Sequence, residues 1–389
     1  MHRTGALTAF EFEKKSCIRD IIRAASGALA ARQHLKVVGK VKEMDGIESV
    51  AAIKPGESRT DGGVVVGLDV GHSAVKISWS NGAKVEKIIF PSAVTPAVDI
   101  SDQDTAARAA AETILAEGKK YFFGNTAMVQ GGSAIASGLV ANWINTTEYK
   151  VLLCAAADRL QNSGANFNKA MIVCGLPSSL VQAQSDVLRG LMGVIFPTAE
   201  IKIQPQPMGA YAYYRLTERG LPSKNIGEGE AWAVIDIGRF SADFLLVIGG
   251  NVVERVSHSS AGTRLVAEKL KQILKTKHEI DDLSPLEAEE VITSGHVLMF
   301  GKKKQVGAEI AEAIEQASSE LLDTAGRLLG QESRRLAGVL VAGGGAQLFY
   351  QSIRKVFPHA IECADARFAV AEGFRRIGAG IVFARKLKG

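Results

Sequence analysis

Four residues in the stretch "GLDVGHSAVK" (67–76) have the types and spacing of a phosphate-binding turn. Asp69 ends an apolar run, Gly71 and Ser73 follow, and Lys76 returns inside a second apolar run. A glycine lets backbone amides approach an oxygen-rich ligand, a serine hydroxyl can donate to it, and a lysine supplies positive charge. A carboxylate would repel a bare phosphate, so Asp69 implies a cation between them, most simply hydrated Mg²⁺. A glycine turn in an ordinary hairpin is the alternative that this stretch alone leaves open.

The same pattern recurs in "AWAVIDIGRFSADFLLVIGG" (231–250). An apolar strand leads to Asp236 and Gly238, and a second apolar strand with Asp243 follows. Two such hairpins, facing each other from two lobes, could hold the two sides of one polyphosphate. Asp69 and Asp236 could then share the water shell of one metal ion. The repetition favours phosphate binding, because chance would have to produce the pattern twice.

A third glycine-rich turn lies in "AGVLVAGGGAQLFYQSIRKVF" (337–357), between a predicted strand and a predicted amphipathic helix. The helix is expected to turn Leu348, Ile353 and Val356 inward. Glycines that open a helix suit the polar groups of a nucleotide, although a plain strand-to-helix turn is the alternative. The turn consists of Gly343, Gly344, Gly345 and Ala346.

The chain that must position these turns is expected to be soluble and globular, and is long enough for two ordinary domains or one two-lobed body. The chain has 389 residues, of which 47% are hydrophobic and 22% charged, and its formal net charge is +5. No apolar segment approaches the ~18–20 residues that span a bilayer. Helical spacing of apolar residues predicts helices over 105–117, 148–161, 182–193, 264–276 and 307–330.

Cysteines and lysines indicate no further site. The four cysteines form no C-x-x-C pair, so a zinc site or redox pair is not expected, and a cytoplasm with reduced thiols fits. Cys174 lies in an apolar run and is expected to be buried. The run Lys302–Lys304 is too short for a nucleic-acid-binding stripe and is predicted to be a solvated loop.

The first 63 residues differ from the rest. Residues 16–35 have apolar residues at roughly helical spacing, with arginines and acidic residues among them, which argues against a transit peptide or a secretory signal. Residues 54–63, "KPGESRTDGG", are typical of a linker. We interpret residues 1–63 as an extension of a body that begins at Val64.

In their order along the chain, the three turns resemble those of the actin, heat-shock chaperone and sugar-kinase ATPase superfamily. Within it, the chain most resembles the bacterial plasmid-segregation actins, the ParM/StbA group, over about residues 64–380. The segments that carry the resemblance are "GLDVGHSAVKISW", "FPSAVTP", "KYFFGNTA", "MIVCGLPSSL", "AVIDIGRFSADFLLV", "SSAGTRLVAEKL", "VLVAGGGAQLF" and "AEGFRRIGAG".

The resemblance implies a role for each turn. Asp69 and Asp236 would orient Mg²⁺ through water, and Lys76 would neutralise phosphate charge. The first phosphate turn would consist of Gly71, His72 and Ser73, and the second of Gly238, Arg239 and Phe240. Gly262, Thr263, Glu268 and Lys269 would lie near ribose and base, with residues 343–346 on the adenosine side. His72 is expected to contribute its backbone, and Arg239 to meet either phosphate or solvent.

The segment "IKIQPQPMGAYAYY" (201–214) departs from the family pattern. Related proteins carry there an acid that positions the attacking water, whereas the aligned residue here is Gln206. A neutral amide can orient water but cannot take its proton, so we expect slow hydrolysis. Slow hydrolysis suits a filament-forming protein, because the nucleotide must outlast assembly. The alternative is that both glutamines face water at the end of a strand.

The resemblance implies an actin-like (ribonuclease H-like) α/β fold with a nucleotide cleft between two lobes. Residues 64–228 plus 347–389 would form domain I, and residues 229–346 domain II. The implied function is a slow ATPase, using ATP or GTP with Mg²⁺, that assembles polar filaments. Its partners would be other copies of itself and a DNA-bound adaptor for plasmid or other cargo, without direct nucleic-acid binding. A small-molecule kinase or a non-polymerising regulatory ATPase is the alternative.

Overall fold

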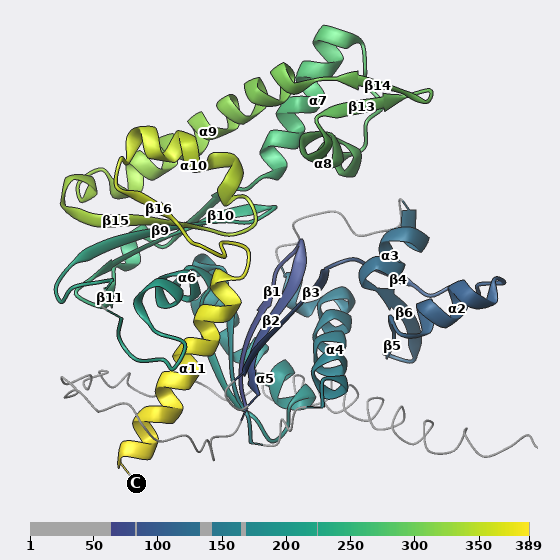
Figure 1. Ribbon diagram of the computed structural model, residues 1–389. Helices are drawn as coiled ribbons and strands as arrows, with labels where there is room; N and C mark the ends of the chain where they lie inside the picture. The colour runs from purple at the N-terminus through teal and green to yellow at the C-terminus, as the bar shows by residue number, and fades with distance from the viewer. Residues whose placement is uncertain (1–63, 82–83, 133–141, 165–168, 224, 389) are drawn as a thin grey trace, which may run out of the picture.

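The computed structural model describes residues 64–81, 84–132, 142–164, 169–223 and 225–388 (Figure 1). The predicted extension 1–63, with Cys17, lies outside these residues. The described chain forms two lobes, each built on one mixed sheet. Layers of helices lie outside both sheets and between them, and the segments predicted to bind phosphate lie where the lobes meet.

The first sheet has the strand order β3-β2-β1-β7-β8. Its central strand β1 is buried on both faces, as its nearly continuous apolar sequence "VVGLDV" predicts. β1 pairs antiparallel with β2, which confirms the first predicted hairpin, and parallel with β7. The strands are β1 Val65–Val70, β2 Ala74–Asn81, β3 Lys84–Pro91, β7 Met171–Leu176 and β8 Glu200–Pro205.

Helices α4 and α5 cover one face of this sheet, and helices α6 and α11 cover the other. Thr146 caps the N-terminus of α4, accepting a hydrogen bond from the Tyr149 amide. Cys174 is buried in this lobe, as expected. The helices are α4 Thr147–Asn162, α5 Val181–Ile195, α6 Gln206–Arg215 and α11 Ala369–Lys388, with short turns η2 Trp143–Asn145 and η3 Ser178–Leu180.

A small subdomain projects from the first lobe, and it corrects one predicted helix. Helix α2 (Gln103–Ala110) ends well before residue 117, and Thr113–Ala116 form strand β5. The chain turns back at Glu117 and Gly118, both at positive φ, so that β5 pairs with β6. The remaining elements here are β4 Val94–Pro96, β6 Lys119–Phe123 and α3 Gly124–Gly131.

The second sheet has the order β11-β10-β9-β15-β16, with β12 also paired to β10. β9 and β10 form the second predicted hairpin. Helices α7, α9 and α10 pack on the face away from the first lobe. The strands are β9 Ala231–Ile237, β10 Ser241–Ile248, β11 Asn251–Val252, β12 His258–Ala261, β15 Leu336–Ala342 and β16 Ala360–Glu362.

The helical side of this lobe confirms most of the remaining predictions. Lys302 and Lys303 are exposed as expected and Lys304 is half-buried, but all three lie in strand β14 rather than in a loop, because they pair with β13. The elements are α7 Arg264–His278, α8 Pro285–Ser294, β13 His296–Met299, β14 Lys302–Gln305, α9 Gly307–Leu329 and α10 Ala346–Val356, with η4 Glu254–Val256 and η5 Ser333–Arg335.

Helix α10 alters two expectations. It buries Phe349 and Ile353, with Phe357 just beyond its end, whereas Val356 is exposed. Both α10 and β16 pack with the second sheet, since β16 pairs in parallel with β15. The return to the first lobe, predicted near residue 347, therefore comes after β16.

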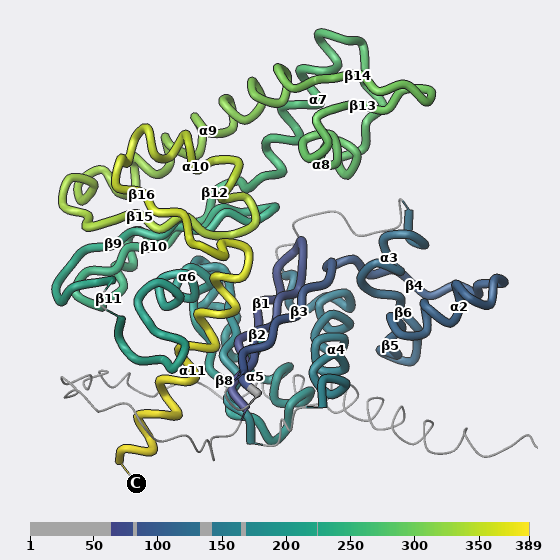
Figure 2. Tube along the Cα trace, viewed as in Figure 1, coloured from purple at the N-terminus to yellow at the C-terminus, as the bar shows by residue number. Residues whose placement is uncertain are grey.

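Helices α6 and α11 form a layer shared by the two lobes. Their buried side chains join residues of β1 and β7 to residues of β9, β10 and β15 in one apolar cluster. Figure 2 shows α11 crossing the first lobe, with its C-terminus at the end remote from the second lobe. Gly67 of β1 allows this packing, because a Cβ there would collide with the α11 backbone at Ala371 and Arg375.

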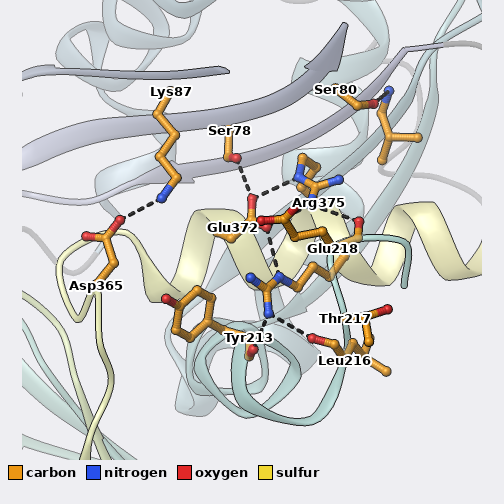
Figure 3. Close-up of polar contacts among 12 residues, drawn as sticks. Ser78, Ser80, Lys87, Tyr213, Leu216, Thr217, Glu218, Asp365, Glu372 and Arg375 are labelled. Carbon is orange, nitrogen blue, oxygen red and sulfur yellow. Dashed lines mark hydrogen bonds and ion pairs between the residues drawn. The ribbon is translucent and has the colours of Figure 1, made fainter. Parts of the chain in front are cut away.

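A buried network of charged side chains joins α11 to strand β2 and to the loop at Glu218 (Figure 3). Glu372 accepts hydrogen bonds from Ser78 of β2 (2.6 Å) and from Arg375 (2.7 and 2.8 Å), and Arg376 donates to it at 2.8 Å. Arg375 also donates to the Glu218 carbonyl. Burial alone would raise the pKa of Glu372, but the Arg375 guanidinium and the Ser78 hydroxyl outweigh it and lower that pKa to about 2.

Replacing Gly67 by alanine tests the close packing of α11 on β1. The added Cβ would force backbone apart, so we expect Gly67→Ala to lower the free energy of unfolding by about 1–3 kcal/mol or more. Gly190→Ala is the matched control, because a Cβ on that exposed residue of α5 meets nothing within 4 Å. It should raise the stability by up to about 1 kcal/mol. Urea denaturation measures both, and equal stability of the two variants would contradict the packing.

Candidate functional site

The two predicted phosphate turns are built alike. The amide of Gly71 donates to the Ala74 carbonyl at 3.2 Å, and the amide of Gly238 donates to the Ser241 carbonyl at 2.8 Å. Each glycine amide thus closes its own turn rather than facing a ligand. Within the described residues, the amides at the two turn tips donate to no backbone carbonyl. These tip residues are His72 and Ser73 in the first turn and Arg239 and Phe240 in the second.

Ser92, at the end of the "FPS" segment, braces the first turn. Its hydroxyl donates to the Gly71 carbonyl at 2.5 Å, and its amide donates to the Ser73 carbonyl at 3.0 Å. Both contacts hold carbonyls of the turn and leave its tip amides unpaired with Ser92. Sequence reasoning noted this segment but gave Ser92 no role.

Asp69 is buried, and both of its carboxylate oxygens are occupied. Lys76, its cross-strand partner, lies 2.8 Å from Oδ2, and the Gln206 side chain donates to Oδ1 at 2.9 Å. Gln206 reaches Asp69 because helix α6 begins there, directly after strand β8. The alternative in which Gln206 merely faces water is therefore wrong.

Asp243 lies opposite Asp236 on the paired strands β10 and β9. It is buried and accepts hydrogen bonds from the hydroxyls of Ser241 (2.9 Å) and Ser259 (2.5 Å) and from the backbone of Ser178. Ser178 belongs to the first lobe, so this carboxylate links the lobes. Burial raises the pKa of Asp243, and these hydrogen bonds work against that rise.

Asp236 is the carboxylate left without a partner. Among the described residues nothing donates a hydrogen bond to it, and it is half-buried. Desolvation and the nearby negative charges of Asp69 and Asp243 raise the pKa of Asp236 to about 7. The positive charge of Lys76 lowers it, but by less. A carboxylate in this setting attracts a further cation.

The donor set fits a hydrated divalent cation better than a dehydrated one. No group of three His, Cys, Asp or Glu side chains in the described part of the chain is placed to hold a metal ion directly. Mg²⁺ keeps several waters and needs only one or two carboxylates when phosphates supply other ligands. Asp236, with Asp69 behind it, meets that requirement.

The glycine turn before α10 lies against the same strand end. Gly343 has φ +86°, and a Cβ there would strike the Ile237 carbonyl and the Asp236 carboxylate; a Cβ on Gly345 would strike Thr263 and Ile237. These two glycines therefore serve packing within the second lobe. A Cβ on Gly344 meets nothing within 4 Å, so of the three it is Gly344 that leaves space for a ligand.

Four residues predicted near ribose and base divide into two pairs. The amides of Gly262 and Thr263 donate to the carbonyls of Phe240 and Gly238, both at 3.0 Å, so this pair supports the second turn. The other two form ion pairs on helix surfaces. These are Glu268 with Arg264 (2.9 Å) and Lys269 with Glu320 (2.8 Å).

The side chains of two turn-tip residues have partners that the sequence did not indicate. Arg239 donates through Nε to Glu289 of α8 at 2.7 Å, and its side chain is half-buried. The ring of His72 stacks on Trp143. Burial, with Arg239 nearby, lowers the pKa of His72 to about 4, so its imidazole is neutral near pH 7.

Sequence reasoning missed several residues that shape the site. Trp143 belongs to the short turn η2, which no quoted segment covers, and Ser178 belongs to the quoted segment "MIVCGLPSSL" but was given no role. Asp243 stood out only as an acid within an apolar strand, which is itself a usable signal. Glu289 could not be paired with Arg239 in advance, because the contact joins residues of different elements.

The raised pKa of Asp236 makes stability depend on pH. Its ionised form is disfavoured in the folded state, so the stability present below pH 4 is lost as pH rises through about 7. Asp236→Asn removes this loss. Between pH 5 and pH 8, the stability of the variant relative to the wild type should rise by about 2 kcal/mol without nucleotide or divalent cations.

Urea denaturation at the two pH values measures this difference. The same change at Asp323, on the exposed side of α9, controls for the Asp-to-Asn substitution itself. A relative stability of Asp236→Asn that is equal at both pH values would show that Asp236 ionises normally.

The described helices include none long and apolar enough to cross a membrane.

Three solved structures share the fold. They are a 15-stranded ParM filament from Clostridium botulinum (20% identity, 81% of this chain and 99% of that chain, TM-score 0.66), MreB5 of Spiroplasma citri bound to ADP (17%, 83% and 98%, 0.62) and an archaeal actin homologue in complex with ADP (20%, 80% and 98%, 0.59). A search of curated protein sequences gave no match.

Two family models match the chain in sequence. The N-terminal domain of actin-like proteins matches residues 67–209, and the C-terminal domain of archaeal MreB-like actin homologues matches residues 234–355. Each match contains one of the Asp-x-Gly hairpins, and together they span more than half of the chain. The chain therefore belongs to the actin-like proteins.

Proposed function

We propose that the protein binds ATP, or GTP, with Mg²⁺ at the junction of its lobes, hydrolyses it slowly and assembles into nucleotide-dependent filaments. One observation carries the nucleotide site. Two turns of the same construction, one from each lobe, have tip amides without backbone acceptors, and Asp236, which precedes the second turn, accepts no hydrogen bond among the described residues. A magnesium–polyphosphate would supply phosphate oxygens as acceptors for the amides and a hydrated cation for the carboxylate.

The residues would divide the work as follows. The amides of the turn tips and the Ser73 hydroxyl donate to phosphate oxygens. Asp236 holds water molecules of the metal shell, and Lys76, already paired with Asp69, offsets the remaining negative charge. Bound Mg²⁺ would neutralise charge on the phosphates. Gly344 leaves room for the nucleoside side of the ligand.

Gln206 is the residue that we assign to water positioning. Its amide is fixed by Asp69, so its remaining oxygen and N–H can orient a water molecule. An amide cannot accept the proton of that water, and hydrolysis is therefore slow. Slow hydrolysis lets a nucleotide-bound state outlast assembly.

Filament formation rests on the fold shared with a ParM protein solved as a filament. A ligand that bridges the lobes favours one relative orientation, and a head-to-tail contact that needs this orientation gives a polar filament. We propose plasmid DNA, held through an adaptor protein, as the cargo, with another cellular cargo as the alternative.

Pelleting by ultracentrifugation with ATP, GTP, ADP and no nucleotide tests assembly. We expect a pellet that depends on the triphosphate and Mg²⁺. Asp69→Asn with Asp236→Asn should weaken Mg–nucleotide binding by about 10–100-fold in calorimetry, because the site loses the carboxylate that holds the metal's water and the negative charge behind it. Unchanged affinity in this folded double variant would overturn the site. Phosphate transfer to a small molecule by a protein that never pellets would favour a kinase.

Restoring an acid at residue 206 tests the cause of slow hydrolysis. Gln206→Glu should raise the rate of phosphate release by about 10-fold or more, since a carboxylate can take the proton of the attacking water. Gln204→Glu, in the same "QPQP" segment, is the matched control and should leave the rate unchanged. Phosphate release is followed at saturating nucleotide. A rate in Gln206→Glu that does not exceed the control would contradict the assignment.

A further inference from the structure

Three aromatic rings meet at the junction of the lobes. The imidazole of His72 stacks on the indole of Trp143, with centroids 4.6 Å apart and planes at 24°. The ring of Phe240 also contacts His72, with ring centroids 5.3 Å apart and planes tilted by 58°. His72 and Trp143 belong to the first lobe and Phe240 to the second. We call these residues the ring bridge.

The ring bridge joins the two phosphate turns directly. His72 is a tip residue of the first turn and Phe240 of the second, so each contributes both a free amide and a ring. Contact between the rings therefore sets the spacing between the two groups of amides. Arg239 and Arg264 hold the Phe240 ring from the second lobe, at 5.1 and 5.4 Å from its centroid.

The ring bridge also leaves polar atoms without partners. His72 Nε2 and Trp143 Nε1 are both buried, and neither has a hydrogen-bond partner. Burial of unpaired polar atoms is unfavourable, so ring packing must offset this cost. Because ring packing is opposed by this cost, the net free energy that holds His72 against Phe240 is small. The contact therefore breaks easily when the lobes separate, and a ligand that binds both turns stabilises it.

We propose that the ring bridge is a positioning device that brings the two phosphate turns to the separation a polyphosphate requires. The inference rests on the proposed nucleotide site and adds a coupling to it. Nucleotide that spans both turns stabilises the His72–Phe240 contact, and loss of phosphate releases it. The stacking of His72 on Trp143 lies within the first lobe and persists in both states.

Substitutions of Phe240 test the coupling through nucleotide affinity. Phe240→Ala should weaken Mg–ATP binding by about two- to tenfold, the range expected for one aromatic contact. AMP has a single phosphate and cannot span both turns, so its affinity should change less. Phe240→Tyr keeps the ring and should restore ATP affinity. Phe300→Ala, which removes a fully exposed ring from the β13–β14 turn, is the matched control.

Substitutions of His72 separate its ring from its nitrogen atoms. His72→Phe keeps the ring and removes the unpaired Nε2, so it should bind Mg–ATP at least as tightly as the wild type. His72→Ala should lose affinity by a factor similar to that of Phe240→Ala. Affinity lost equally in His72→Phe and His72→Ala would show that the imidazole binds phosphate itself, and would overturn the ring bridge.

Tryptophan emission supplies a second readout. Mg–ATP should change the emission of the wild type, and Trp143→Phe should remove most of that change. The other tryptophans are buried in apolar clusters, Trp79 in that of the first lobe and Trp232 in the one shared by the two lobes, and the Trp143→Phe variant measures what they contribute. Calorimetry on the wild type comes first: no Mg–nucleotide binding there would refute the proposed function. If the wild type binds but Phe240→Ala binds ATP with equal affinity and gives the same emission change, the ring bridge alone is refuted.

Discussion

Crowding of carboxylates at the junction of the lobes is the constraint on which the site depends. Asp69, Asp236 and Asp243 act on one another electrostatically, and Lys76 is the cation that opposes them. Asp69 is held by Lys76 and Gln206, and Asp243 by serine donors from both lobes. Asp236 is left uncompensated. Repulsion among the carboxylates destabilises the protein without ligand. Binding of a hydrated cation together with phosphates would relieve this repulsion.

The layer of α6 and α11 explains why these groups meet. Gln206 is the first residue of α6, and α11 presses on β1, the strand that ends in Asp69. Glycines allow the backbones to touch, and the Glu372 network fixes the register of α11. Because both sheets pack on this layer, small movements of one lobe are transmitted to the turn tips of the other.

Local patterns predicted most of the framework. Both Asp-x-Gly hairpins, the strand before the glycine turn and four long helices follow from periodicity and turn residues, which act within a few positions. The predictions were wrong where a residue or strand packs against a partner that is distant in the sequence. Periodicity alone placed Val356 inside, and β16 could not be assigned to a sheet without knowing that β15 lies beside it. Arg239 and Trp143 found their partners through tertiary contacts that no spacing encodes.

Helix α11 has a consequence for how the chain matures during synthesis. The ribosome makes β1 near the start of the described chain, but the helix that covers one face of that strand comes from residues 369–388. Until those residues leave the exit tunnel, β1 and β7 present an apolar surface without its cover. The first lobe therefore completes its folding only after the second lobe has been translated, and the nascent chain is vulnerable to aggregation in the interval.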